Sequence, residues 1–149
     1  MKHTLTATLL VLGLLSVGTA YAAPKGKAEP AAGTVWTEPK TGMEFAYMPA
    51  GCFEMGGDGR TYEQPIHKVC VKGYWMGRTE VTQGQYVQIM GKNPSEFQGT
   101  NRPVNNVIWS EATDFAEEMA ATTGTKVKLP TEAQWEYACR AGGAHEKYL

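Results

Sequence analysis

The sequence predicts an α+β fold in which short strands come first and helices follow. Between residues 43 and 76, polar and apolar residues alternate in short runs that stop at Pro or Gly, which is typical of strands. From residue 82 onward, apolar residues recur at helical spacing behind capping residues. Strands and helices do not alternate along the chain, so nothing favours a parallel sheet and we expect long irregular connections within one domain.

The first 22 residues have the features of a secretory signal peptide. Lys2 precedes an apolar stretch centred on residues 9–17, and Ala20 and Ala22 form the small-x-small pattern of a cleavage site. The stretch is too short to cross about 30 Å of hydrocarbon as a helix, and no second apolar run follows, so we expect no membrane span. We predict a soluble protein that is periplasmic or secreted.

Charge and composition argue against a nucleic-acid partner. The chain has 14 Lys and Arg residues against 15 Asp and Glu residues and offers no basic stripe. Residues 23–34 are small, charged and broken by Pro and Gly, which predicts a flexible leader. The folded domain is therefore expected over residues 35–149, which is long enough for one compact core.

The strand candidates lie in the first half of this domain. Residues 44–48 and 52–55 alternate on either side of Pro49 to Gly51, and we interpret them as a hairpin. Residues 66–72 form a third candidate and are followed by the apolar group at 74–76. A sheet of short strands is expected here.

Two of the three expected helices come next. Thr82 is expected to cap the first, with Gln85 as its capping-box partner, and Gly91 to end it. Ser110 is expected to cap the second, which ends at Gly124. Its apolar positions recur at helical spacing and predict one buried face that includes Phe115 and Met119.

The third helix is predicted from a second capping box, formed by Thr131 and Gln134. Trp135, Ala138 and Cys139 are expected to share its apolar face. We expect this helix to stop before Gly142.

A long connection at residues 92–106 separates the first two helices. Loops of this length inside a compact domain are usually functional or are held by their own side chains. Phe97 is flanked by polar groups, so this loop is the place where we would look for a contact with a partner.

Five segments appear in an order that resembles a known family. They are GCFEMG at 51–56, YEQPIH at 62–67, GRTEVTQ at 77–83, PVNNVIW at 103–109 and LPTEAQWEYA at 129–138. Together they resemble the N-terminal half of the formylglycine-generating enzymes, also called sulfatase-modifying factor domains. The resemblance implies a loop-rich variant of the C-type-lectin-like fold.

The resemblance also implies an activity, the oxidation of a Cys in exported sulfatases to Cα-formylglycine with O2 and a copper ion held by two cysteines. Those cysteines lie in the C-terminal half of the family domain, which continues well past the segment resembling residues 137–142. We therefore assign no catalytic, cofactor-binding or metal-binding residue in this chain, Cys139 included, and expect the domain to be incomplete at its C-terminus. Copper is implied only if a C-terminal half exists.

Cys52 and Cys70 fall on two strand candidates separated by a loop. A disulfide between them is the simplest use of these cysteines in an exported protein. It would stabilise the fold by about 3 kcal/mol in the chain-entropy model. Cys139 is then left as a small buried hydrophobe, or as the partner of a Cys outside this chain.

Two polar residues have a chemical and a structural interpretation. His67 has Glu63 four residues before it, but no second His at ligand spacing, so a hydrogen-bonded structural role is favoured over metal binding. Glu80, which comes just before the cap Thr82, is interpreted as a turn residue rather than a catalytic acid.

Three hypotheses for function follow. The first is an enzyme of the sulfatase-modifying type that acts on an exported protein or peptide, of which this chain is the N-terminal part. The second is a non-catalytic C-type-lectin-like binding module of the cell envelope. The third, iron-dependent sulfur chemistry as in ergothioneine assembly, fits less well with an export signal.

Overall fold

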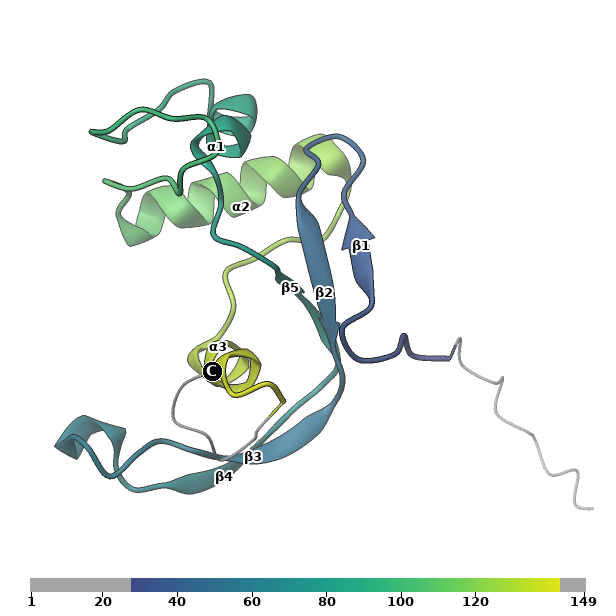
Figure 1. The fold of residues 1–149 in the computed structure, drawn as a ribbon, viewed down its shortest axis with the longest axis vertical. Coiled ribbons are helices and arrows are strands. Elements are labelled where there is room, and N and C mark those ends of the chain that lie inside the picture. The colour runs from purple at the N-terminus through teal and green to yellow at the C-terminus, as the bar shows by residue number, and fades with distance from the viewer. Residues whose placement is uncertain (1–27, 143–149) are drawn as a thin grey trace, which may run out of the picture.

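The computed structural model describes residues 28–142, and the predicted signal peptide lies outside them. The order of elements is that of an α+β fold, with strands before helices (Figure 1). The strands are β1 (Val35–Thr37), β2 (Glu44–Met48), β3 (Gly51–Met55), β4 (His67–Val71) and β5 (Tyr74–Gly77), with a short 3-10 helix η1 (Thr61–Glu63). The helices are α1 (Gln83–Met90), α2 (Trp109–Thr123) and α3 (Glu132–Cys139).

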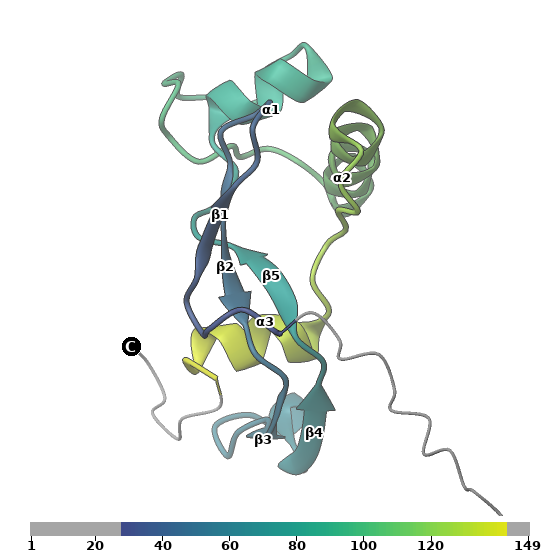
Figure 2. The same cartoon turned by 90° about the vertical axis from the view of Figure 1, so that its right-hand side faces the viewer.

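The strands form two antiparallel sheets. One has the order β1-β2-β5, and the other is the β3–β4 pair. Figures 1 and 2 show an elongated molecule, with α1 and α2 at one end and the β3–β4 pair with α3 at the other. Residues 124–131 connect α2 to α3 along the side of the three-stranded sheet.

The predicted hairpin of residues 44–48 and 52–55 is wrong. β2 pairs with β1 and β5, whereas β3 pairs with β4. A two-residue hairpin turn needs positive φ angles, which Pro49 cannot adopt because its ring fixes φ near −65°. The chain therefore passes from β2 into a second sheet instead of folding back.

The main core lies where α1 and α2 pack together. Met43, Tyr86, Phe115 and Met119 form its buried cluster, and the rings of Tyr86 and Phe115 stack with centroids 5.3 Å apart. Met119 is fully buried, as the helical spacing predicted. Val127, from the segment before α3, packs against the edge of this cluster.

The helix ends confirm two of the three predicted caps. Thr82 and Gln85 form a capping box on α1, and Thr131 and Gln134 form one on α3. The prediction for α2 is wrong, since its N-cap is Ile108 and not Ser110. The Glu111 carboxylate accepts the Ile108 N–H at 3.1 Å, which starts the helix two residues before the expected position.

The predicted apolar face of α3 is also wrong. Tyr137 is the buried residue, with its ring 5.4 Å from that of Phe53, while Trp135 is 56% exposed and Cys139 is exposed. α3 packs mainly on β3 and β4, so the residue that faces this pair becomes the anchor. The Glu136 carboxylate adds a hydrogen bond from the Gly56 N–H at 2.9 Å.

Candidate functional site

Four aromatic rings cover one face of the three-stranded sheet. The directly paired residues Trp36 and Phe45 have ring centroids 5.5 Å apart, and the paired residues Tyr47 and Trp75 have centroids 5.3 Å apart. Trp36 and Trp75 are 6.3 Å apart across the sheet, with an edge-to-face angle of 61°. Such cross-strand aromatic pairs stabilise a sheet and leave an apolar surface for a ligand or a chain segment.

A groove of about 250 Å³ lies between this aromatic surface and residues 125–130. Trp36, Phe45 and Trp75 line it on the sheet side. Val127, Lys128 and Pro130 line it on the other side. A second hollow, of about 310 Å³, is lined by Val127, Lys128 and Leu129 of the same segment and by the exposed Trp109. Residues 125–130 therefore contribute to two depressions.

Tyr74 also lines the groove. Its hydroxyl donates a hydrogen bond to the backbone oxygen of Gln134 at 2.6 Å and so ties β5 to α3. Burial raises the pKa of Tyr74 to about 12, with smaller contributions from the nearby Tyr137 and Cys139. The hydroxyl therefore remains a protonated donor even at a pH near 10, where an ordinary tyrosine begins to ionise.

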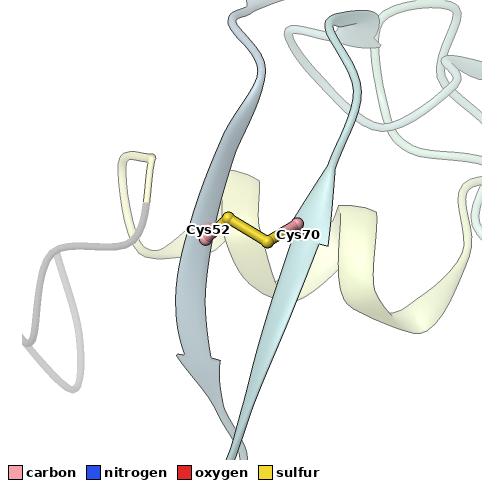
Figure 3. Close-up of a disulfide and its surroundings, with 2 residues drawn as sticks. All are labelled: Cys52 and Cys70. Atoms are coloured by element: carbon pink, nitrogen blue, oxygen red, sulfur yellow. A yellow bond between two sulfur atoms is a disulfide. The ribbon is translucent and has the colours of Figure 1, made fainter.

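The predicted disulfide between Cys52 and Cys70 is present (Figure 3). The two residues are directly paired across β3 and β4, and both are exposed. Phe53 points the other way, into the contact with α3, because successive side chains of a strand alternate between faces. A disulfide of this kind indicates an oxidising compartment.

The described residues do not fit the two-cysteine copper site that the resemblance implies. Cys52 and Cys70 are joined to each other, which leaves Cys139 as the free cysteine of residues 28–142. Within that range, no group of three or more His, Cys, Asp or Glu side chains is placed to hold a metal ion. We derive no chemical step through copper from these residues.

His67 and Glu80 do not come together into a site. The His67 ring places Nδ1 2.9 Å from the Pro65 carbonyl oxygen, and since a carbonyl can only accept, Nδ1 carries the proton. This contact agrees with the structural interpretation of His67. Glu80 is exposed in the turn before α1.

The loop at residues 92–106 is held by Gln83, a residue that sequence reasoning missed. The Gln83 side chain is 2% exposed, and its Nε2 donates to the backbone oxygens of Phe97 and Pro103 at 3.0 and 3.2 Å. Its Oε1 accepts from Asn93 Nδ2 and from the Gly99 N–H, both at 2.9 Å. The loop is therefore tied down, while the Phe97 side chain stays 64% exposed.

We expect Gln83→Ala to loosen this loop and to lower the free energy of unfolding by about 2 kcal/mol, because several buried polar groups lose their partner together. Amide hydrogen exchange at Gly99 should accelerate as its acceptor disappears. Gln88→Ala is the matched control on the same helix, since it removes one exposed hydrogen bond to Lys40 and should change stability by less than about 0.5 kcal/mol. Equal effects of the two substitutions would contradict the loop-holding role of Gln83.

Sequence reasoning also missed the aromatic groove. Its clearest signal is the alternation of Thr125 to Leu129, which is strand-like although it lies between two helices. The rings of Trp36 and Trp75 come from strands far apart in sequence and give no local signal.

The model of the sulfatase-modifying factor enzyme 1-like domain matches residues 31–149, which is more than half of the chain. The chain belongs to this family. The match confirms the resemblance seen in the five segments.

Curated relatives are similar over part of the chain. A chaperone protein, LppX of Paenibacillus barcinonensis, is 26% identical over 113 residues, which cover 54% of this chain and 40% of that protein. The formylglycine-generating enzyme of Streptomyces coelicolor is 44% identical over 48 residues, or 32% of this chain and 13% of the enzyme. The mouse formylglycine-generating enzyme is 40% identical over 52 residues, or 35% of this chain and 12% of the enzyme.

Two solved structures share the sulfatase-modifying-factor type of fold. PvdO from Pseudomonas aeruginosa superposes with a TM-score of 0.67 at 27% identity, over 78% of this chain and 54% of that one. Treponema denticola variable protein 1 gives the same TM-score of 0.67 at 24% identity, over 80% of this chain and 60% of that one. The likeness confirms the predicted fold class, and this chain spans little more than half of either structure.

Within residues 28–142, no helix is long and apolar enough to cross a membrane.

Proposed function

We propose that this chain is the N-terminal part of an exported sulfatase-modifying factor protein whose whole form oxidises a Cys side chain of another exported polypeptide to formylglycine. The family match over residues 31–149 carries the proposal, and the two similar enzymes of that name support it. Residues 31–149 supply the scaffold, and the redox centre lies outside them.

The overall reaction balances with a reductant. The Cβ–S bond of the substrate Cys breaks, a Cβ=O bond forms, and the sulfur leaves as hydrogen sulfide. O2 takes two electrons from this carbon and two from a thiol reductant. One oxygen atom ends in the aldehyde and the other in water, while the reductant becomes a disulfide.

The test of activity uses the polypeptide encoded from Met1 to the end of its reading frame, a Cys-x-Pro-x-Arg peptide, copper, O2 and a thiol. We expect mass spectrometry to show thiol-to-aldehyde conversion of the peptide. Conversion should persist in Cys139→Ser, because that side chain is not assigned to the redox centre. Failure of the polypeptide to convert the peptide would overturn the proposal in favour of a binding module, and loss of conversion in Cys139→Ser would overturn the placement of the centre.

Export is tested separately with alkaline phosphatase fused after Leu149 in a bacterial host. The reporter is active only where its own disulfides form, so we expect activity with the full chain. Removal of residues 2–22 should abolish it. Equal activity of both fusions would contradict export, and the disulfide between Cys52 and Cys70 supports the expected result.

A further inference from the structure

The bridge between Cys52 and Cys70 lies on the solvent side of the β3–β4 pair (Figure 3). Side chains alternate along both strands, so the directly paired Phe53 and Val69 face α3 while the two cysteines face away from it. Phe53 is buried and Val69 is half-buried, whereas Cys52 and Cys70 are both exposed. A thiol in solution can therefore reach the sulfur atoms without any prior opening of the fold.

The charges near the bridge distinguish its two ends. Lys68 and Lys72 come two residues before and two residues after Cys70, and both are exposed. Glu54 comes two residues after Cys52 and lies opposite Lys68 in the register. Positive charge favours a departing thiolate and negative charge opposes it. Attack on the bridge should therefore release Cys70 and leave Cys52 joined to the attacking sulfur.

The bridge holds one end of the molecule together. The β3–β4 sheet has only two strands, and α3 packs mainly on them. The Arg140 guanidinium donates to the backbone oxygens of Glu54 and Gly56 at 3.0 and 2.6 Å, and these bonds need β3 in place. The α1–α2 core lies at the other end (Figure 1). Loss of the bridge should therefore loosen β3, β4 and α3 and leave that core folded.

We propose that the Cys52–Cys70 bridge is a thiol–disulfide exchange site of the folded chain, at which a dithiol reductant opens the β3–β4 end of the molecule. A thiolate of the reductant attacks the Cys52 sulfur, the S–S bond breaks, and Cys70 leaves as a thiolate. The second thiolate of the reductant then attacks the reductant sulfur of the mixed disulfide and releases Cys52. The reductant becomes a disulfide, and its two electrons and two protons end on the two cysteines.

The rate of reduction tests whether the folded chain is attacked. Dithiothreitol is added to the oxidised polypeptide encoded from Met1 to the end of its reading frame, and alkylation of Cys52 and Cys70 with peptide mapping follows the loss of the bridge. We expect the rate in the folded protein to lie within about tenfold of the rate in urea, because exposed sulfur atoms need no unfolding. A bridge that reacts only after unfolding would be slower by at least about 10³-fold, which would overturn the proposal.

Gln83→Ala separates direct attack from attack after unfolding. Its expected destabilisation of about 2 kcal/mol corresponds to about 30-fold in the unfolding equilibrium, at about 1.4 kcal/mol per tenfold. Reduction that requires global unfolding would accelerate by the same factor. We expect no acceleration, and a rate that follows the measured change in stability would contradict direct attack.

The direction of attack is tested with two matched double variants. Lys68→Gln with Lys72→Gln should slow reduction by about three- to tenfold, whereas Lys126→Gln with Lys128→Gln makes the same change in net charge away from the bridge and should have no effect.

The first adduct identifies the attacked sulfur. With the uncharged thiol 2-mercaptoethanol, it should map to Cys52. A first adduct on Cys70, or equal slowing by both double variants, would overturn the assignment of Cys70 as the leaving group.

Amide hydrogen exchange tests the consequence of reduction. In dithiothreitol, amides of β3, β4 and α3 should exchange at least about tenfold faster, and the Met119 amide should stay within about twofold. Removal of the reductant and reoxidation should restore the slow exchange.

The variant with both Cys52 and Cys70 replaced by Ser is the control, since it should show the same fast exchange without reductant and no further response to it. Unchanged or uniform exchange would contradict the opening of one end. None of these measurements uses peptide oxidation, so this inference and the proposed function can fail separately.

Discussion

Met119→Ala is expected to lower the free energy of unfolding by about 2 to 5 kcal/mol. Met119 is fully buried on α2, in one cluster with Tyr86 and Phe115. Truncation removes its apolar side chain and leaves a cavity that the stacked rings of Tyr86 and Phe115, with centroids 5.3 Å apart, cannot easily fill. Urea denaturation followed by circular dichroism measures the change.

Glu118→Ala is the matched control for this prediction. It changes the adjacent position of the same helix, but Glu118 is exposed, so its effect should remain within about 0.5 kcal/mol. A loss from Met119→Ala no larger than that of the control would show that the α1–α2 core does not limit the stability of the chain.

The sequence predicted those elements whose signals are local. The capping boxes of Thr82 and Thr131 depend on residues three positions apart, so both could be identified without a structure. The disulfide could also be inferred, because the predicted export signal and two cysteines on separate strand candidates favour pairing. The buried face of α2 followed from helical spacing alone.

The errors concern contacts between distant segments. Nothing local distinguishes Trp135 from Tyr137 as the anchor of α3, since the choice depends on the position of Phe53 in another sheet. The pairing of β2 with β5 rather than β3 likewise depends on aromatic contacts across the sheet, such as that between Tyr47 and Trp75. The expectation that Phe115 and Met119 form a buried face was confirmed, while the expectation that Cys139 is buried was wrong.

The candidate site was the least predictable part. Gln83 appears in the sequence as an ordinary residue in the first turn of α1, and its four hydrogen bonds arise only when the loop folds over it. The aromatic groove joins residues from β1, β2, β5 and the segment before α3. Their convergence is a property of the topology.

Replacement of both Cys52 and Cys70 by Ser is expected to lower the free energy of unfolding by about 3 kcal/mol. The disulfide closes a loop with a sequence separation of 18, which restricts the unfolded chain. The β3–β4 sheet has only two strands, and such pairs are marginal when isolated. Denaturant titration of the double variant against the oxidised chain measures the loss.

The loss should be greatest in one part of the molecule. α3 packs on β3 and β4, whereas α1 and α2 pack on each other, so amide exchange should accelerate most in the β3–β4 pair and α3. Cys139→Ser is the control, because Cys139 is free and exposed and its substitution should change stability by less than about 0.5 kcal/mol. Two or more free thiols in the unreduced, unfolded chain would exclude the disulfide, and uniform acceleration across all three helices would show that the two ends of the molecule unfold as one unit.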